Sequence, residues 1–173
     1  MSVDPARDVL DAESRATGDD HDALRVWLRL LATTHGIEAL VRGRLQARFG
    51  ITLARFDYLA QLERSPQGLR MRELSERLMV TGGNVTGLTD ALEAEGHVVR
   101  EADPDDRRAF RVRLTPAGRR VFRAMASEHE RWIVEIFAQM APRDVARLRD
   151  LLGQVKQQVR SIGGARPIAG ARP

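Results

Sequence analysis

Two stretches of alternating apolar and polar residues, joined by a short charged loop, constrain the fold of this chain more than any other feature. Residues 97–100 and 110–114 have the period of two that is typical of β-strands. Residues 103–108 between them read Asp-Pro-Asp-Asp-Arg-Arg, a composition typical of a hairpin turn. Because the other periodic segments have helical spacing, the sequence predicts a mainly α fold with a small β-hairpin wing.

Helical segments stand on both sides of this hairpin. The predicted helices before it cover 22–49, 52–63, 70–78 and 81–95, with Thr52 and Thr81 as N-caps and Gly50 and Gly96 as terminators. After the hairpin, Thr115-Pro116 starts a long helix, and Ala141-Pro142 separates it from a last apolar stripe at 145–159. The order is therefore helices, hairpin, helices.

Charge is distributed unevenly along the chain. The whole chain carries a net charge of +4. Residues 1–20 carry −4, so residues 21–173 carry +8. A basic body indicates a polyanionic partner, although the strong preference for arginine over lysine can also follow from genome composition. The charge alone leaves both interpretations open.

Several function classes are excluded by what the sequence lacks. It has no cysteine, so it cannot form disulfides, hold Cys-ligated metals or sense oxidants through a thiol. The four histidines lack metal-type spacing, and no Gly-Lys-Ser/Thr or Gly-x-Ser-x-Gly element occurs. We therefore expect a cytoplasmic protein with no membrane span, no catalytic residue, no metal site and no cofactor.

A short helix, a tight turn, a second helix and a basic hairpin are the order of a winged helix-turn-helix, whose second helix enters the DNA major groove. Residues 68–120 resemble the MarR family of bacterial transcription regulators. The resemblance rests on residues 71–78, on the segment from Asn84 to Gly96, and on the hairpin with the Leu-Thr-Pro-Ala-Gly that follows it at 114–118.

The resemblance implies a homodimer whose two lobes bind a pseudo-palindromic operator in double-stranded DNA. The apolar stripes at 121–140 and 145–159 support pairing independently, because one small lobe cannot cover them. The predicted division is a disordered acidic segment at 1–20, a single MarR-like domain at 21–160 and a flexible tail at 161–173. Within the domain, 21–50 and 121–160 are expected to be dimerisation helices, and 51–120 the winged helix-turn-helix lobe.

Polar contacts to DNA are predicted on the second helix. Val85, Leu88 and Leu92 define its buried face, so the opposite side faces the groove. Family members often have long side chains where this chain has glycines, which favours close backbone approach and shape readout over bidentate base contacts. The predicted set is Thr81, Gly82, Gly83, Asn84, Thr86, Gly87 and Thr89, with a plain N-cap as the alternative role of Thr81.

The hairpin tip supplies the second predicted DNA contact. In the family pattern an arginine at the tip enters the minor groove, and Arg108 matches it, with Arg107 beside it and Asp106 orienting it. The alternative is a solvated hairpin whose ion pairs contribute less than about 1 kcal/mol each.

An effector pocket is the least constrained prediction. The resemblance implies a small aromatic acid between the dimerisation helices and the lobe. Residues expected by position are Arg29, His35, Arg42, Phe56, Tyr58 and Trp132. For Phe56, His35 and Trp132, ordinary core packing is the alternative, and an acyl-CoA held by the arginine-rich first helix is an alternative effector.

Together these features predict a dimeric, sequence-specific DNA-binding regulator, a repressor that a small effector releases. Two other functions stay open at this point. One is an architectural DNA-binding protein without an effector, and the other is a helical module that holds protein partners.

Overall fold

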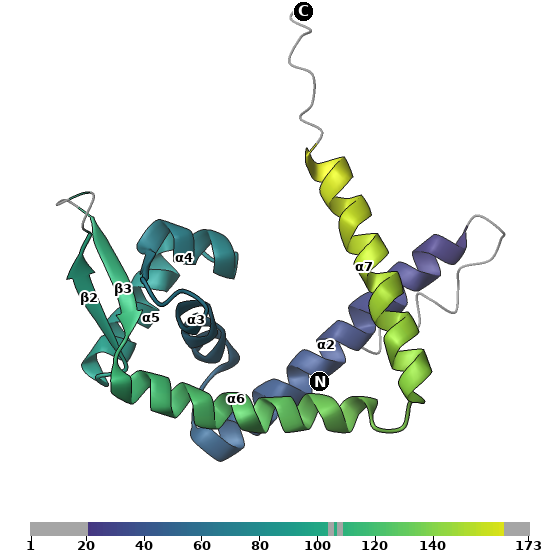
Figure 1. Cartoon of the computed structure of the whole chain (residues 1–173), viewed down its shortest axis with the longest axis horizontal. Coiled ribbons are helices and arrows are strands. Elements are labelled where there is room, and N and C mark those ends of the chain that lie inside the picture. Colours follow the sequence, from purple (N-terminus) through teal and green to yellow (C-terminus); the bar gives the residue numbers. More distant parts are fainter. Residues whose placement is uncertain (1–20, 104–105, 107–108, 165–173) are drawn as a thin grey trace, which may run out of the picture. The chain divides into compact units, whose positions relative to one another are not determined.

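The computed structural model describes residues 21–103, 106 and 109–164. Its helices are α2 (Asp22–Phe49), α3 (Leu53–Glu63), α4 (Met71–Leu78), α5 (Gly82–Ala94), α6 (Pro116–Phe137) and α7 (Pro142–Gly164). Its strands are β1 (Leu69–Arg70), β2 (Val98–Ala102) and β3 (Phe110–Leu114) (Figure 1). The predicted mainly α fold with a winged helix-turn-helix is therefore confirmed.

The helix ends lie where local capping chemistry predicts them. Thr52 Oγ1 accepts a hydrogen bond from the Arg55 amide at 3.4 Å, and Thr115 Oγ1 accepts one from the Gly118 amide at 2.9 Å. Gly50 ends α2 in the left-handed conformation, with φ of 66°. Because these signals act within one helical turn, the sequence alone is enough to locate them.

The wing is a three-stranded antiparallel sheet with the order β1-β3-β2, rather than the two-stranded hairpin that we predicted. Leu69 pairs with Val112, and Val98 pairs with Leu114. The turn before β1 needs Gly68, whose φ is 79° and where a Cβ would lie 2.6 Å from Arg113 Cγ. A strand of two residues is too short to show alternation, so periodicity could not reveal it.

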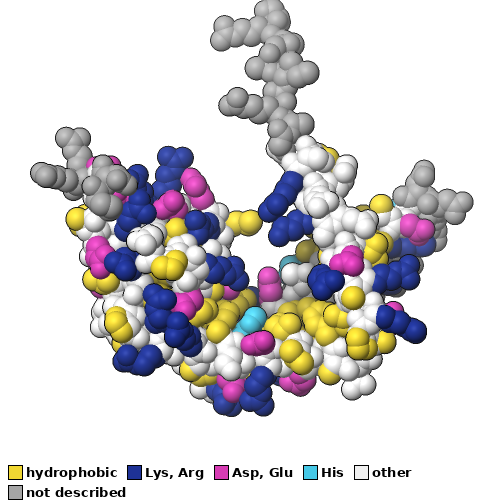
Figure 2. All heavy atoms as spheres, in the orientation of Figure 1, with side chains coloured by type: hydrophobic (Ala, Val, Ile, Leu, Met, Phe, Trp, Pro, Cys, Tyr) yellow, Lys and Arg dark blue, Asp and Glu magenta, His cyan; other side chains and the backbone are white. Residues whose placement is uncertain are grey.

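The chain forms two compact units, one ending at His129 and the other beginning at Glu130. The core of the first unit contains fully buried leucines from α2 (Leu45), α3 (Leu59), α4 (Leu74) and α5 (Leu92). The end of α2 is thus part of the lobe core and not solely the dimerisation helix we expected at 21–50. Lys and Arg side chains gather on the surface around the start of α6 (Figure 2).

The two predicted flexible ends fall largely outside the described residues. Helix α7 continues to Gly164, past residue 161 where we predicted the tail to begin. Residues 165–173 and the predicted disordered segment at 1–20 lie outside the described part of the chain. None of the helices in the described part is long and apolar enough to cross a membrane.

Candidate DNA interface and cavity

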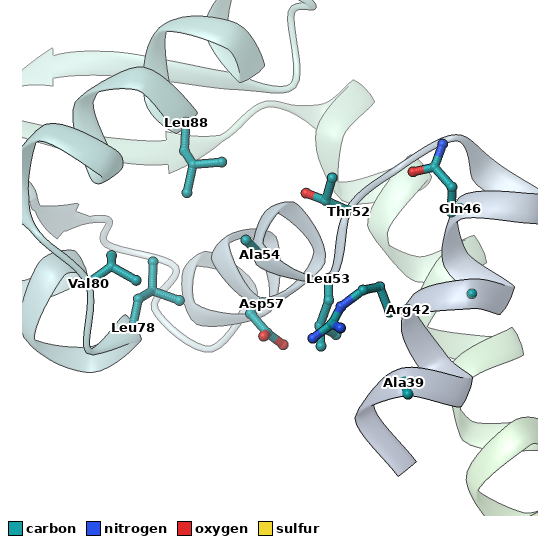
Figure 3. Close-up of a pocket in the computed structure, with 11 residues that line it drawn as sticks. Ala39, Arg42, Gln46, Thr52, Leu53, Ala54, Asp57, Leu78, Val80 and Leu88 are labelled. Carbon is teal, nitrogen blue, oxygen red and sulfur yellow. The ribbon is translucent and has the colours of Figure 1, made fainter. Parts of the chain in front are cut away.

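A cavity of about 790 Å³ opens between α2, α3 and the helix-turn-helix (Figure 3). Most of its lining is apolar and includes Leu53 of α3, Leu78 at the end of α4 and Leu88 of α5. Arg42 extends from α2 toward Leu53 and Asp57 of α3. The volume lies within the range of about 300–1,000 Å³ that small-molecule sites occupy, and the charged groups are few.

Asp57 is the acidic group of this cavity. Burial raises the pKa of its carboxyl, and the nearby negative charge of Glu38 raises it further. His129 and Arg64 act in the opposite direction. A carboxyl in this setting gains a proton more readily than one in water.

Of the six residues predicted for an effector pocket, Arg42 alone lines this cavity, and the effector pocket itself stays a prediction. Phe56 is in the core, with its ring centroid 5.6 Å from that of Phe122 and 5.0 Å from that of His129. Tyr58 is fully buried, and Trp132 is a buried residue of the second unit. Arg29 and His35 are exposed on α2 and do not line the cavity.

The first turns of α5 expose three glycines among short polar side chains. Thr81 is the N-cap, and its Oγ1 accepts a hydrogen bond from the Asn84 amide at 3.4 Å. Gly82, Gly83 and Gly87 are exposed, and a Cβ added at any of them would meet nothing within 4 Å. The free amides of such a helix start are donors suited to an anion such as a DNA phosphate.

Thr86 and Thr89 differ sharply although both were predicted as DNA contacts. Thr86 is exposed, and its hydroxyl donates to the Gly82 carbonyl at 3.0 Å. Thr89 is fully buried, so its prediction as a DNA contact is corrected. The spacing of Val85, Thr89 and Leu92 places all three on one helix face, a signal that could have revealed the burial.

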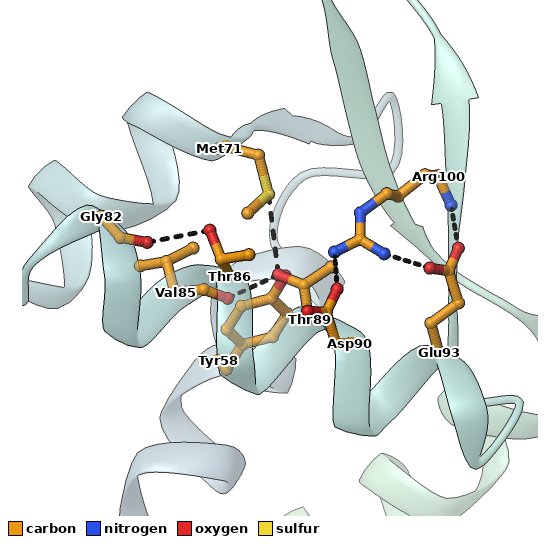
Figure 4. A network of polar contacts seen from close by, with 9 residues as sticks. All are labelled: Tyr58, Met71, Gly82, Val85, Thr86, Thr89, Asp90, Glu93 and Arg100. Carbon is orange, nitrogen blue, oxygen red and sulfur yellow. Dashed lines mark hydrogen bonds and ion pairs between the residues drawn. The ribbon is translucent and has the colours of Figure 1, made fainter.

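Thr89 instead belongs to a buried network (Figure 4). Its hydroxyl donates to the Val85 carbonyl at 2.7 Å and lies 2.5 Å from the Tyr58 hydroxyl. Since Thr89 has one hydroxyl hydrogen, Tyr58 is the donor of the second bond. Burial raises the pKa of Tyr58 to about 12. This bond fixes the middle of α5 to α3.

Arg100 fixes the same helix to the wing. Its guanidinium pairs with Asp90 and with Glu93 of α5, and its amide donates to Glu93 Oε1 at 3.0 Å (Figure 4). Sequence reasoning missed all three residues, because a pattern of single residues does not reveal which charges meet across elements. The network holds α5 and β2 in one fixed relation, which makes Arg100 a positioning residue.

The base of the wing is built around Asp103, whose side chain is fully buried. Arg70 Nε donates to Asp103 Oδ2 at 2.6 Å, and Arg111 Nε donates to the same oxygen at 2.8 Å. Asp103 therefore joins the start of α4 to the wing. Asp106, which we expected to orient the tip, is exposed, and its carbonyl accepts from the Ala109 amide at 2.9 Å. Arg107 and Arg108 lie outside the described residues.

A two-helix motif with an exposed second helix, followed by an antiparallel wing, defines a winged helix-turn-helix protein. The MarR family profile matches residues 49–109. The crystal structure of a MarR family transcriptional regulator from Silicibacter pomeroyi is 32% identical, with a TM-score of 0.68, and the match covers 83% of this chain and 99% of that one. The chain belongs to the MarR family of transcriptional regulators, a family of DNA-binding proteins and not of enzymes.

Two further comparisons bear on the lobe. An HTH-type transcriptional regulator of Bacillus cereus is 40% identical over 78 residues, which are 45% of this chain and 52% of that protein, so the match spans about half its length. Streptococcus pneumoniae FabT, solved in complex with DNA, is 24% identical with a TM-score of 0.68, covering 82% of this chain and 99% of that one. The second comparison shows a shared fold.

Proposed function

We propose that this regulator binds a pseudo-palindromic operator as a homodimer and acts as a repressor that a small aromatic acid releases. The single observation that carries the DNA part is the exposed, glycine-rich start of α5, held by the Tyr58 and Arg100 contacts to α3 and β2. A fixed helix with free amides and no bulky side chains suits close approach to a duplex. Arg107 and Arg108 of the wing are the proposed minor-groove contacts.

Homodimerisation is supported by apolar side chains that a single chain leaves exposed. On α7 these are Leu151, Val155, Val159 and Ile162, whose spacing of four, four and three puts them on one face of that helix. On α2, Leu24 and Trp27 are exposed as well. A second copy of the chain would cover these surfaces and present two lobes to half-sites about 34 Å apart.

Operator binding is tested by the double change Arg107→Ala and Arg108→Ala, with fluorescence anisotropy on promoter DNA at fixed salt. We expect at least about a 100-fold loss of affinity, because the minor-groove contacts disappear from both lobes of the dimer. The matched control is Arg149→Ala with Arg160→Ala, two exposed arginines on the side of α7 opposite its apolar face. Unchanged affinity in the wing variant would instead favour a helical module that binds proteins.

The proposed effector site is the cavity beside Arg42. Its apolar lining suits a planar hydrocarbon body, and a single guanidinium suits one carboxylate better than the several phosphates of an acyl-CoA. The effector would release DNA by binding more tightly to a dimer whose lobes have the wrong spacing. Moving occupancy from 99:1 to 1:99 needs about 5.5 kcal/mol of differential affinity.

The effector part is tested by thermal shift with a panel of aromatic carboxylates and acyl-CoAs. We expect the aromatic carboxylates to raise the melting temperature of the natural chain and to do so less in an Arg42→Met variant. A stronger shift with acyl-CoAs would reassign the effector class. No shift with any compound, in a chain that still binds its operator, would remove the effector from the proposal.

One observation favours a second candidate function, that of an architectural DNA-binding protein. Three of the residues on the exposed side of α5 are glycines, which cannot read base edges with side chains. The two functions differ in the ratio of operator affinity to random-duplex affinity, which is about 10³ or more for a specific regulator. A ratio near one with a steep salt dependence would favour the architectural function.

A further inference from the structure

A second hollow, of about 640 Å³, lies at the junction of β2, β3 and the start of α6. Four arginine side chains line it, Arg113 from β3 and Arg119, Arg120 and Arg123 from α6. We call this site the arginine hollow. Its volume lies within the usual range for small-molecule sites, and all its residues belong to the first compact unit.

The arginine hollow opens on the side of the sheet that faces away from α5. Arg100 of β2 reaches Asp90 and Glu93 of α5, so the side chains of even-numbered β2 residues face that helix. Val99 and Glu101 alternate with Arg100 and line the hollow. A ligand there therefore does not compete for the exposed face of α5.

Positive charge in the arginine hollow exceeds the negative charge available to neutralise it. Arg113 Nη1 lies 2.9 Å from Glu101 Oε2. Glu63 forms ion pairs with two arginines. Its Oε2 lies 3.0 Å from Arg119 Nη1, and its Oε1 lies 3.4 Å from Arg123 Nε. Four guanidinium groups thus face two carboxylates.

Arg120 accounts for part of this excess. Within the described part of the chain it is exposed and has neither an ion pair nor a hydrogen bond from its side chain. Like charges gathered in one hollow repel one another, and a bound anion relieves that repulsion. Arg120 and the outer nitrogens of Arg123 are therefore available for a ligand.

The remaining lining determines which kind of anion fits. Val99, Leu114 and Pro116 supply an apolar surface beside the arginines. Guanidinium groups bind phosphate oxygens through paired N–H donors and also stack on planar rings. A ligand that carries phosphates on a planar or apolar body satisfies both parts of the lining.

We propose that the arginine hollow is a binding site for a small phosphorylated ligand of nucleotide size, separate from the DNA surface and from the cavity beside Arg42. Phosphate groups can also belong to the backbone of a long duplex that bends around the lobe. The test therefore includes both a free phosphorylated compound and duplexes of two lengths.

Binding is measured by isothermal titration calorimetry with ADP, inorganic pyrophosphate and adenosine on the full chain. We expect ADP to bind with submillimolar affinity, pyrophosphate to bind more weakly, and adenosine not to bind. The variant Arg120→Gln with Arg123→Gln should weaken ADP binding at least about tenfold. The control Arg147→Gln with Arg149→Gln removes the same charge from α7 and should bind ADP as the natural chain does.

The proposal is overturned if ADP and pyrophosphate do not bind, or if both double variants bind ADP equally well. It is also overturned if the hollow variant loses affinity for a long duplex and not for a short one, because the site would then hold flanking DNA phosphates. Thermal melts of the variants check the fold. Since ADP binding is measured without DNA, its failure is distinguishable from a failure of the proposed operator binding.

Discussion

The two halves of α5 are built on opposite principles. The first half has three exposed glycines and buries Val85, while the second half is held by Thr89, Asp90 and Glu93 through bonds to other elements. Most polar side chains in the second half of this helix thus bond to the rest of the lobe, and few long side chains extend into solvent from the first half. The difference teaches that, if α5 binds DNA as proposed, it does so through rigidity and surface shape rather than through long side chains.

The largest expected effect on operator affinity comes from adding a side chain to the glycine-rich first half of α5. Gly87→Glu should lower operator affinity by about 100-fold, because bulk and negative charge are placed where the DNA backbone approaches. The fold should survive, since a Cβ at Gly87 meets nothing within 4 Å. Anisotropy measures the affinity, and a thermal melt measures the stability.

Two controls sharpen that experiment. Gly153 of α7 also has open space around its Cβ position and lies opposite the apolar face of that helix, so Gly153→Glu should leave DNA affinity unchanged. Gly87→Ala should raise the free energy of unfolding by about 0.5–1 kcal/mol through helix propensity. If Gly87→Glu binds the operator normally, the glycine-rich first half of α5 is not the DNA surface.

A smaller effect on operator affinity is expected from removing the ion pairs that hold the second half of α5. Arg100→Gln removes the ion pairs to Asp90 and Glu93 and should lower operator affinity about tenfold, because α5 and the wing then lose their fixed relation. The free energy of unfolding should fall by only about 1 kcal/mol, since the groups are partly exposed.

An Arg100→Lys variant distinguishes positioning from simple charge. It keeps the charge but cannot reach both carboxylates with one planar fork, so it should recover less than half of the lost binding free energy. Equal salt dependence of the natural chain and the glutamine variant is expected, because Arg100 does not touch phosphate. A salt slope reduced by about one in Arg100→Gln would instead identify a direct phosphate contact.

Removing the Tyr58 hydroxyl should have a still smaller effect. Tyr58→Phe deletes the bond to Thr89 and should cost about 1 kcal/mol of unfolding free energy, measured by urea denaturation. Thr89 keeps its bond to the Val85 carbonyl, so the loss is not larger. The variants Tyr58→Phe and Thr89→Val should be non-additive in a double-mutant cycle, and full additivity would contradict the bond.

The last prediction concerns pH and needs no substitution. Tyr58 is the single tyrosine of the chain, so absorbance at alkaline pH reports it alone. Burial raises its pKa from 10.0 to about 12, so the folded chain keeps the proton while the unfolded chain releases it. Unfolding free energy should therefore fall as pH rises from 10.0 toward about 12. Ionisation near pH 10 in the folded chain would contradict the burial.

Sequence reasoning located what depends on neighbours along the chain. The caps at Thr52, Thr81 and Thr115 act within one turn, and the alternation of β3 spans five residues, so both could be predicted. The order of the elements followed from the same residue patterns. The caps, the alternation and this order are confirmed by the structure, while the role that the resemblance implies for the wing stays a prediction.

What sequence reasoning missed depends on contacts between distant residues. Asp103 is buried because Arg70 and Arg111 converge on it, and nothing in its own neighbourhood distinguishes it from Asp106. The cavity lining failed for the same reason, since Phe56 faces Phe122 and His129 instead of the cavity. Such errors affect the prediction of sites most, because the residues of a site come from elements that are distant in the sequence.

One close approach has a mechanical consequence. The Thr115 amide donates to the His97 carbonyl at 3.0 Å, and a Cβ at Gly118 would lie 1.9 Å from that carbonyl oxygen. His97 itself donates its amide to the Leu92 carbonyl of α5 at 2.9 Å. The beginning of α6 and the end of α5 are thus both bonded to His97, and the approach at Gly118 leaves no space for a methyl group. A rotation of α6 therefore strains the bonds that His97 makes to both helices, which couples the movement of α6 to that of α5.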